Sequence, residues 1–196
     1  MGRLSSGVLA VAAAALTVMV TVQPVQAAEG RPPLPDATDE AFDQECLAAH
    51  NQYRARHGAP PLHLDDEAVA HATRRARDAS TQDGLAPSPG TVGWGDNRFR
   101  FATYENEPAS CGEAVRLWYE ARWTGGYDWD RPGYSPDRGS FTQVVWKSSE
   151  RLGCGRAAGR PDGEESYQTY IVCSYAPAGN VIGQFKDNVG EPIGEN

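Results

Sequence analysis

The sequence predicts an α+β domain in which helices pack on a mostly antiparallel sheet. Segments with helical periodicity come first, and two strand-like segments separated by a turn come last. The length of 196 residues suits one domain with its own core, and the sequence contains no internal repeat.

Residues 1–28 are predicted to be a secretory signal peptide. Arg3 precedes an apolar run over residues 7–22, and the small side chains of Val25 and Ala27 suit a signal peptidase. A retained membrane anchor is disfavoured, because the run is short for a span of ~20 residues and no basic cluster follows it. We therefore expect a secreted, extracellular, monomeric chain that keeps 168 of the 196 residues and has no transmembrane segment.

The charge balance argues against a nucleic acid as the main partner. The chain has 18 basic and 26 acidic residues, a net charge of −8, and loss of Arg3 with the signal peptide makes it −9. Each phosphate contact needs a Lys or Arg that a negative surface opposes. Arg98 and Arg100, which alternate with Phe99 and Phe101, are therefore interpreted as a solvated edge.

Two helices are predicted in the first part of the chain. Residues 29–38 contain three prolines and are expected to be an exposed leader. The first helix covers residues 39–57, where acidic residues occupy the first turn and apolar residues recur at helical spacing. The second follows Asp65 and Asp66, which can cap its amides. Its inner face consists of small side chains: Ala68, Val69, Ala72, Ala76 and Ala79.

The second part of the chain is predicted to hold one more helix and the strands. Residues 82–108 form a long loop with an extended piece over residues 98–104, and Ser110 begins the third helix with a capping-box pattern. Residues 142–146 form an apolar, β-branched run, and residues 167–175 alternate as a half-buried strand does. Three tryptophans fall on helix or strand faces and are expected in the core: Trp118, Trp123 and Trp146.

Four cysteines in an exported chain predict two disulfides. Cys154 and Cys173 lie in strand-like segments on either side of the turn signal Arg160-Pro161-Asp162-Gly163, so neighbouring strands would bring them together. We pair these two, which leaves Cys46 with Cys111 by elimination. No Cys-x-x-Cys spacing supports a metal site.

Three segments resemble the CAP superfamily of cysteine-rich secretory proteins, venom antigens and plant pathogenesis-related proteins. They are residues 139–149 (GSFTQVVWKSS), residues 171–181 (IVCSYAPAGNV) and the opening-helix pattern HNQYR followed by HGAPPL over residues 50–62. The resemblance implies a three-layer α-β-α sandwich and a bridge between Cys154 and Cys173. It places the CAP domain at residues 39–187, followed by a C-terminal tail over residues 188–196, and is closest to the fungal branch, associated with sterol and fatty-acid export.

Many family members have a cleft in which two histidines and two glutamates can hold zinc. Carried over to this chain, the first histidine falls in Leu-Ala-Pro-Ser, the second on Ser140 and one glutamate on Ala121. Only Glu105, in Tyr104-Glu105-Asn106, resembles the family's Gly-Glu-Asn, so Glu105 and Ser140 are the expected remnant of the cleft. Glu105 is equally interpreted as a buried acceptor for loop amides. We expect no metal and no cofactor.

The chain is not expected to be an enzyme. Its four histidines, His50, His57, His63 and His71, lack the spacing of a metal pair and are interpreted as structural. No metalloprotease, nucleophile-elbow, Walker or dinucleotide motif occurs.

One loop resembles the caveolin-binding loop of the fungal sterol-binding members. It presents Tyr127, Trp129, Pro132, Gly133 and Tyr134 in an aromatic-x-aromatic-x(4)-aromatic pattern. Such rings offer flat apolar area to a sterol, although they can equally pack inward as a small core. The hypothesis is a secreted, non-catalytic protein that binds a sterol or fatty acid. A protein-recognition or defence module is the alternative, and a metal-dependent peptidase is less favoured.

Overall fold

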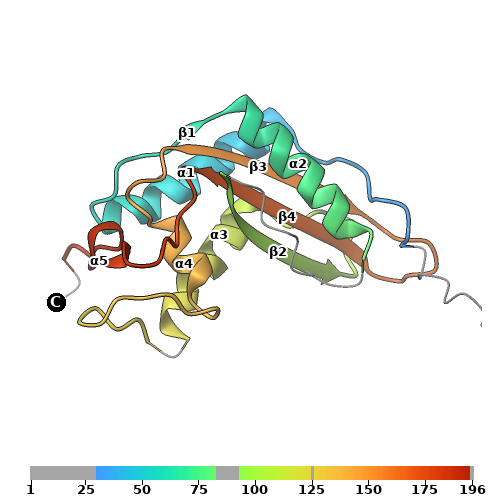
Figure 1. Ribbon diagram of the computed structural model, residues 1–196. Helices are drawn as coiled ribbons and strands as arrows, with labels where there is room; N and C mark the ends of the chain where they lie inside the picture. The colour runs from blue at the N-terminus through green and yellow to red at the C-terminus, as the bar shows by residue number, and fades with distance from the viewer. Residues whose placement is uncertain (1–29, 83–92, 125, 195–196) are drawn as a thin grey trace, which may run out of the picture.

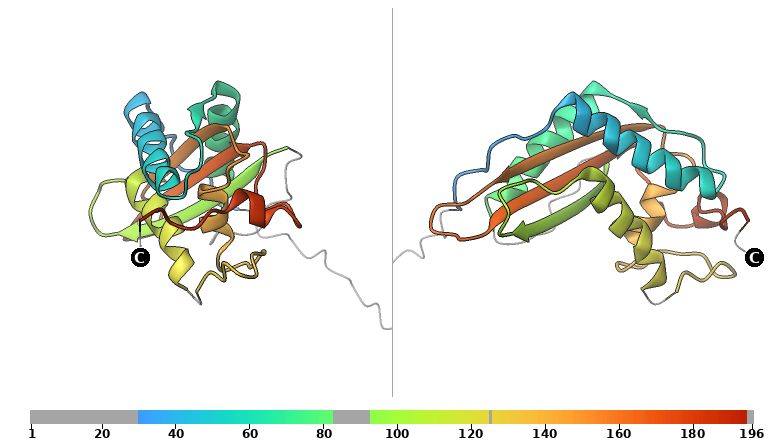
Figure 2. Two further views of the ribbon diagram at one scale, coloured as in Figure 1. Left: turned by 90° about the vertical axis from the view of Figure 1, so that its left-hand side faces the viewer. Right: turned by 180° about the vertical axis from the view of Figure 1, so that it is seen from behind.

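The computed structural model describes residues 30–82, 93–124 and 126–194, and it shows a sheet between helices (Figures 1 and 2). The predicted signal peptide lies outside the described residues. The strands are β1 (His63–Leu64), β2 (Gly95–Thr103), β3 (Arg151–Gly159) and β4 (Tyr167–Ala176). The helices are α1 (Glu40–Arg56), α2 (Asp66–Ser80), α3 (Cys111–Glu120), α4 (Gly139–Val144), α5 (Phe185–Asn188) and the short 3-10 turn η1 (Ala121–Trp123). The α+β sandwich is confirmed.

The sheet has the order β1-β3-β4-β2 and is antiparallel except where the two-residue β1 pairs with β3. The prediction of a half-buried strand at residues 167–175 is wrong, because β4 is central and buried on both faces beyond its first residue. Strand β2 lies at the edge, as expected for the segment with Arg98 and Arg100.

Side-chain carboxylates and a hydroxyl begin the three long helices where the sequence predicts. Asp39, Asp65 and Ser110 each accept a hydrogen bond from the amide three residues on, which satisfies one of the free amides of a first turn. The first helix was expected over residues 39–57, and α1 differs by one residue at each end.

Helix α2 packs its small-residue face directly on β3. Ala68, Ala72 and Ala76 are fully buried. A Cβ at Gly153 would lie 2.0 Å from the Val69 amide nitrogen, and one at Gly155 would lie 2.3 Å from the Thr73 Cα. The backbones of helix and strand therefore touch at these two glycines.

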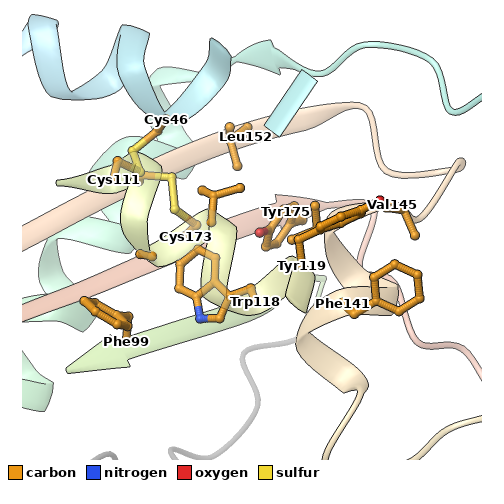
Figure 3. Close-up of a cluster of buried hydrophobic side chains, with 14 of the residues drawn as sticks. Cys46, Phe99, Cys111, Trp118, Tyr119, Phe141, Val145, Leu152, Cys173 and Tyr175 are labelled. Carbon is orange, nitrogen blue, oxygen red and sulfur yellow. A yellow bond between two sulfur atoms is a disulfide. The ribbon is translucent and has the colours of Figure 1, made fainter. Parts of the chain in front are cut away.

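Larger side chains and both disulfides fill the opposite face of the sheet (Figure 3). Cys46–Cys111 joins α1 to α3, and Cys154–Cys173 joins the paired strands β3 and β4, with Cα atoms 4.1 Å apart. Both are the pairs expected from the sequence. Trp118 and Trp146 are buried, also as expected.

Several local expectations are wrong. The β-branched run at residues 142–146 lies mostly in the short helix α4, where the Thr142 hydroxyl oxygen lies 3.2 Å from two backbone carbonyls of the preceding turn and tertiary packing outweighs strand propensity. Trp123, expected in the core, is 66% exposed, because η1 ends the α3 segment beyond the sheet.

The two ends of the expected domain pack on it. In the leader, residues 30–38, Leu34 is buried and Asp36 bridges to Ala157 of β3. In the tail, Val189 is buried and the Gly190 carbonyl contacts His57. Among the described residues, no helix is long and apolar enough to cross a membrane.

Candidate functional site

The loop before α4 contributes residues to two hollows in the surface. The first, named here the aromatic hollow, has a volume of about 450 Å³ and lies beside η1 and the C-terminal tail. Its lining is Arg122, Trp123, Gly126, Tyr127, Trp129, Glu191 and Pro192. The second, named the polar cleft, has a volume of about 300 Å³ and lies between β2 and the start of α4. Its lining is Asp96, Asn97, Arg98, Tyr134, Pro136, Gly139, Ser140 and Asn180.

The aromatic hollow rests on a cluster of rings around Phe141 of α4. Tyr127 and Trp129 meet edge to face with ring centroids 4.6 Å apart, and both also contact Phe141 edge to face. Trp129 stacks on His57 at 6.0 Å. Burial raises the pKa of Tyr127 to about 12, so its hydroxyl stays neutral. These rings hold the loop in place and leave Trp123 as the exposed aromatic wall.

The histidines of α1 have structural roles. His50 contacts the Cys46 carbonyl and the Tyr175 hydroxyl, both at 2.7 Å. Burial lowers its pKa to about 4. His57 contacts the Gly190 carbonyl at 2.7 Å and the Tyr119 hydroxyl at 3.0 Å. Both imidazoles therefore tie α1 to other elements, as expected for structural histidines.

The polar cleft is built on Asp96 of β2. Its carboxylate accepts from the Ser174 hydroxyl at 2.8 Å and from Arg75 Nε at 3.2 Å. The Asn97 amide donates to the Ser140 carbonyl at 3.0 Å, which joins β2 to α4. These bonds fix the groups that face the cleft.

The structure does not bring the two expected remnant residues together. Ser140 lines the polar cleft, whereas Glu105 is exposed beyond the far end of β2. Glu105 therefore lies outside the cleft and is not a buried acceptor. The acidic residue that lines the polar cleft together with Ser140 is Asp96, which the sequence analysis did not select. Gly95-Asp96-Asn97 keeps the glycine and asparagine of the family tripeptide and replaces only Glu by Asp. That order was the signal that could have identified it.

The donors in the polar cleft do not suit zinc. Its one carboxylate already neutralises a guanidinium, and its other possible ligands are amides and hydroxyls, whereas zinc prefers imidazole, thiolate and free carboxylate. Glu120, one place before Ala121, pairs with Arg116 on the surface of α3. Within the described ranges, the only group with metal-ligand geometry is the four cysteines, and all four are in disulfides.

The expected lipid-binding loop is divided between the two hollows. Tyr127 and Trp129 line the aromatic hollow, with Tyr127 only 9% exposed, whereas Tyr134 lines the polar cleft and is 54% exposed. Pro132 and Gly133 lie between them and are partly buried. The five residues therefore do not form one apolar surface.

Comparison with known proteins identifies the family. The model of the cysteine-rich secretory protein family, CAP, matches residues 47–175. Secreted protein RBT4 of Candida albicans is 38% identical over 145 residues, 74% of this chain and 37% of that protein. Protein PRY2 of Saccharomyces cerevisiae is 35% identical over 152 residues, 76% of this chain and 41% of that protein. The chain thus spans less than half the length of these two relatives.

A human relative matches over nearly its whole length. Golgi-associated plant pathogenesis-related protein 1 of Homo sapiens is 31% identical over 159 residues, 80% of this chain and 97% of that protein. Among solved structures, the crystal structure of NaASP2 with Zn2+ has a TM-score of 0.58 at 23% identity, covers 81% of this chain and 92% of that one, and shares the fold. The chain belongs to the cysteine-rich secretory protein (CAP) family and is similar to its fungal members.

Proposed function

We propose that this protein binds an apolar small molecule, a sterol or a fatty acid, in the aromatic hollow, and that it acts outside the cell as a non-catalytic monomer. The observation that carries the proposal is a hollow of about 450 Å³ with three aromatic side chains in its wall. That volume lies within the range of small-molecule sites, which are lined mainly by apolar and aromatic groups. Fungal relatives named as secreted proteins support an extracellular site of action.

Trp123 is the side chain on which the proposed binding depends most. It is 66% exposed, and the Arg122 guanidinium lies 4.2 Å from its ring centroid. Its indole therefore has apolar area left to bury against a ligand, at about 25 cal/mol per Å². Tyr127 and Trp129 supply the floor of the site, because they are already fixed against Phe141.

The alternatives draw less support. A metal-dependent peptidase needs ligands that the polar cleft does not supply. A protein-recognition module would use exposed apolar residues, but Tyr104, Trp123 and Ile182 lie on separate elements or loops of the chain.

The test measures saturable binding of labelled cholesterol and of labelled palmitate to the purified protein and to Trp123→Ala. We expect binding of at least one probe, and we expect the variant to weaken it about tenfold, which corresponds to about 1.4 kcal/mol of lost burial.

Tyr104→Ala is the matched control, because Tyr104 is a more exposed aromatic residue, at 81%, and lies outside the hollow. It should bind as the unchanged protein does. Absence of saturable binding for both probes, or equal binding by Trp123→Ala, would refute the proposal.

A further inference from the structure

The polar cleft has the composition of a site for a polar ring and lies apart from the aromatic hollow. Tyr134 supplies an exposed aromatic surface at its rim. A Cβ at Gly139 would lie only 3.1 Å from the Tyr134 ring, so the absence of a side chain there allows the ring to rest against the start of α4. The ring is nevertheless 54% exposed. It is therefore a supported platform on which a ligand can stack.

Polar groups surround this platform and are fixed in advance. The side chain of Asp96 is 12% exposed and is held by Ser174 and Arg75. The Asn180 amide donates to the Gly139 carbonyl at 2.9 Å, and its oxygen accepts from the Thr142 hydroxyl. Each carboxylate oxygen and each hydroxyl keeps a further lone pair after these bonds. A ligand with several hydroxyl groups can use them at little cost in ordering.

The charges favour a neutral ligand. The cleft is lined by one acidic and one basic side chain, Asp96 and Arg98, and Asp96 also pairs with Arg75, so neither sign of charge dominates locally, while the whole chain has a net charge of −8. The volume of about 300 Å³ is at the lower end for small-molecule sites, which suits a single ring.

We propose that the polar cleft binds one neutral pyranose unit of a saccharide, with the sugar ring stacked on Tyr134 and its hydroxyls bonded to Asp96, Ser140 and Asn180. The carbon-bound hydrogens on one face of a pyranose suit the electron-rich face of an aromatic ring. The hydroxyls at its edge match groups that both donate and accept. An exposed aromatic ring and a fixed acidic residue that line the same cleft provide both halves of this recognition.

Saturation-transfer difference NMR on the full mature chain tests the proposal with three neutral probes: hexasaccharides of β-1,3-linked glucose, of N-acetylglucosamine and of α-linked mannose. We expect saturable binding of at least one probe, with a Kd of about 1 mM, because the site is shallow and makes few contacts. An oligomer of galacturonic acid should bind more weakly than the neutral probes, because the whole chain has a net charge of −8.

Variants separate the platform from the rest of the molecule. Tyr134→Ala should weaken binding about tenfold or more, Tyr134→Phe should retain it, and Ser140→Ala should weaken it severalfold. Trp123→Ala should bind the saccharide normally, which keeps this result independent of the lipid test. Lack of saturable binding for all three neutral probes, or unchanged binding by Tyr134→Ala, would overturn the proposal.

Discussion

The two faces of the sheet are held to their helices by different means. On one face α2 meets β3 backbone to backbone, through Gly153, Gly155 and a row of buried alanines (Figure 1). On the other face α1, α3 and α4 pack through aromatic side chains, two disulfides and buried polar groups. Contact through small residues leaves no space for a ligand, whereas contact through long side chains can leave hollows between them.

Both hollows belong to the second kind of packing. Phe141 of α4 supports the rings of the aromatic hollow, and Ser140, its neighbour, lines the polar cleft. The position of α4 therefore decides both sites. Changes on the α2 face should alter stability first, and changes around α4 should alter stability and binding together.

The largest effect is expected from Gly153→Ala. The added Cβ would meet the Val69 nitrogen at 2.0 Å and the Ala68 carbonyl carbon at 2.1 Å, and these backbone atoms have no room to shift. We expect a loss of about 4 kcal/mol or more, or failure to fold, measured by urea unfolding.

Gly133→Ala is the matched control, because its Cβ would meet no atom within 4 Å and its φ is not in the left-handed region. It should leave stability within about 0.5 kcal/mol of the original. Near-normal stability of Gly153→Ala would mean that α2 is not in backbone contact with β3.

The next largest loss of stability is expected from a change at Arg54, which is fully buried on α1. Its guanidinium donates to the carbonyls of Pro60, Val144, Trp146 and Ser149. Two of these carbonyls lie at or just after the C-terminal end of α4. Arg54→Met should cost about 3 kcal/mol or more, because several buried carbonyls lose their donor. It should also weaken binding in both hollows, which a calorimetric titration with the probes above would detect.

Arg56→Met is the control for Arg54→Met, since Arg56 is exposed on the same helix and its guanidinium lies over the rings of Tyr53 and Tyr119. Loss of stability in Arg54→Met with fully retained binding would contradict the link between α4 and the two sites.

The face built from small residues was also the more predictable from sequence. The alanine spacing of α2 and its capping carboxylate are local patterns, and together they predicted the observed helix. The helix α4 could not be predicted from local sequence, because it depends on packing against α3 and on the carbonyls that Arg54 binds. A β-branched run carries no sign of such distant partners.

The candidate site was predictable only in part, for a related reason. Ser140, which a long motif surrounds, lines the polar cleft, whereas the carboxylate was assigned to Glu105 by residue identity instead of by the glycine before it. Gly95 is the more informative residue, since a Cβ there would lie 2.2 Å from the Gln143 side-chain oxygen. The division of the aromatic loop into two hollows depends on which rings reach Phe141, and spacing alone does not determine that.

The smallest effect is electrostatic and again lies on the face with buried polar groups. Burial, with smaller contributions from Asp39, Asp36 and Asp66, raises the pKa of Asp43 from 3.8 to about 6. The folded protein therefore binds a proton more readily than the unfolded chain between these values, and ionised Asp43 destabilises the fold above pH 6. Asp43→Asn should raise stability by about 1 kcal/mol at neutral pH, after allowance for solvent screening, and should give almost no gain near pH 4.

Thermal unfolding of Asp43→Asn at both pH values measures this gain, with exposed Glu40→Gln as the control. Burial lowers the pKa of His50 to about 4, and this opposite shift is the same in the original protein and in Asp43→Asn, so it cancels when their stabilities are compared. An equal gain at both pH values would mean that the benefit comes from the amide and not from removal of a partly buried charge.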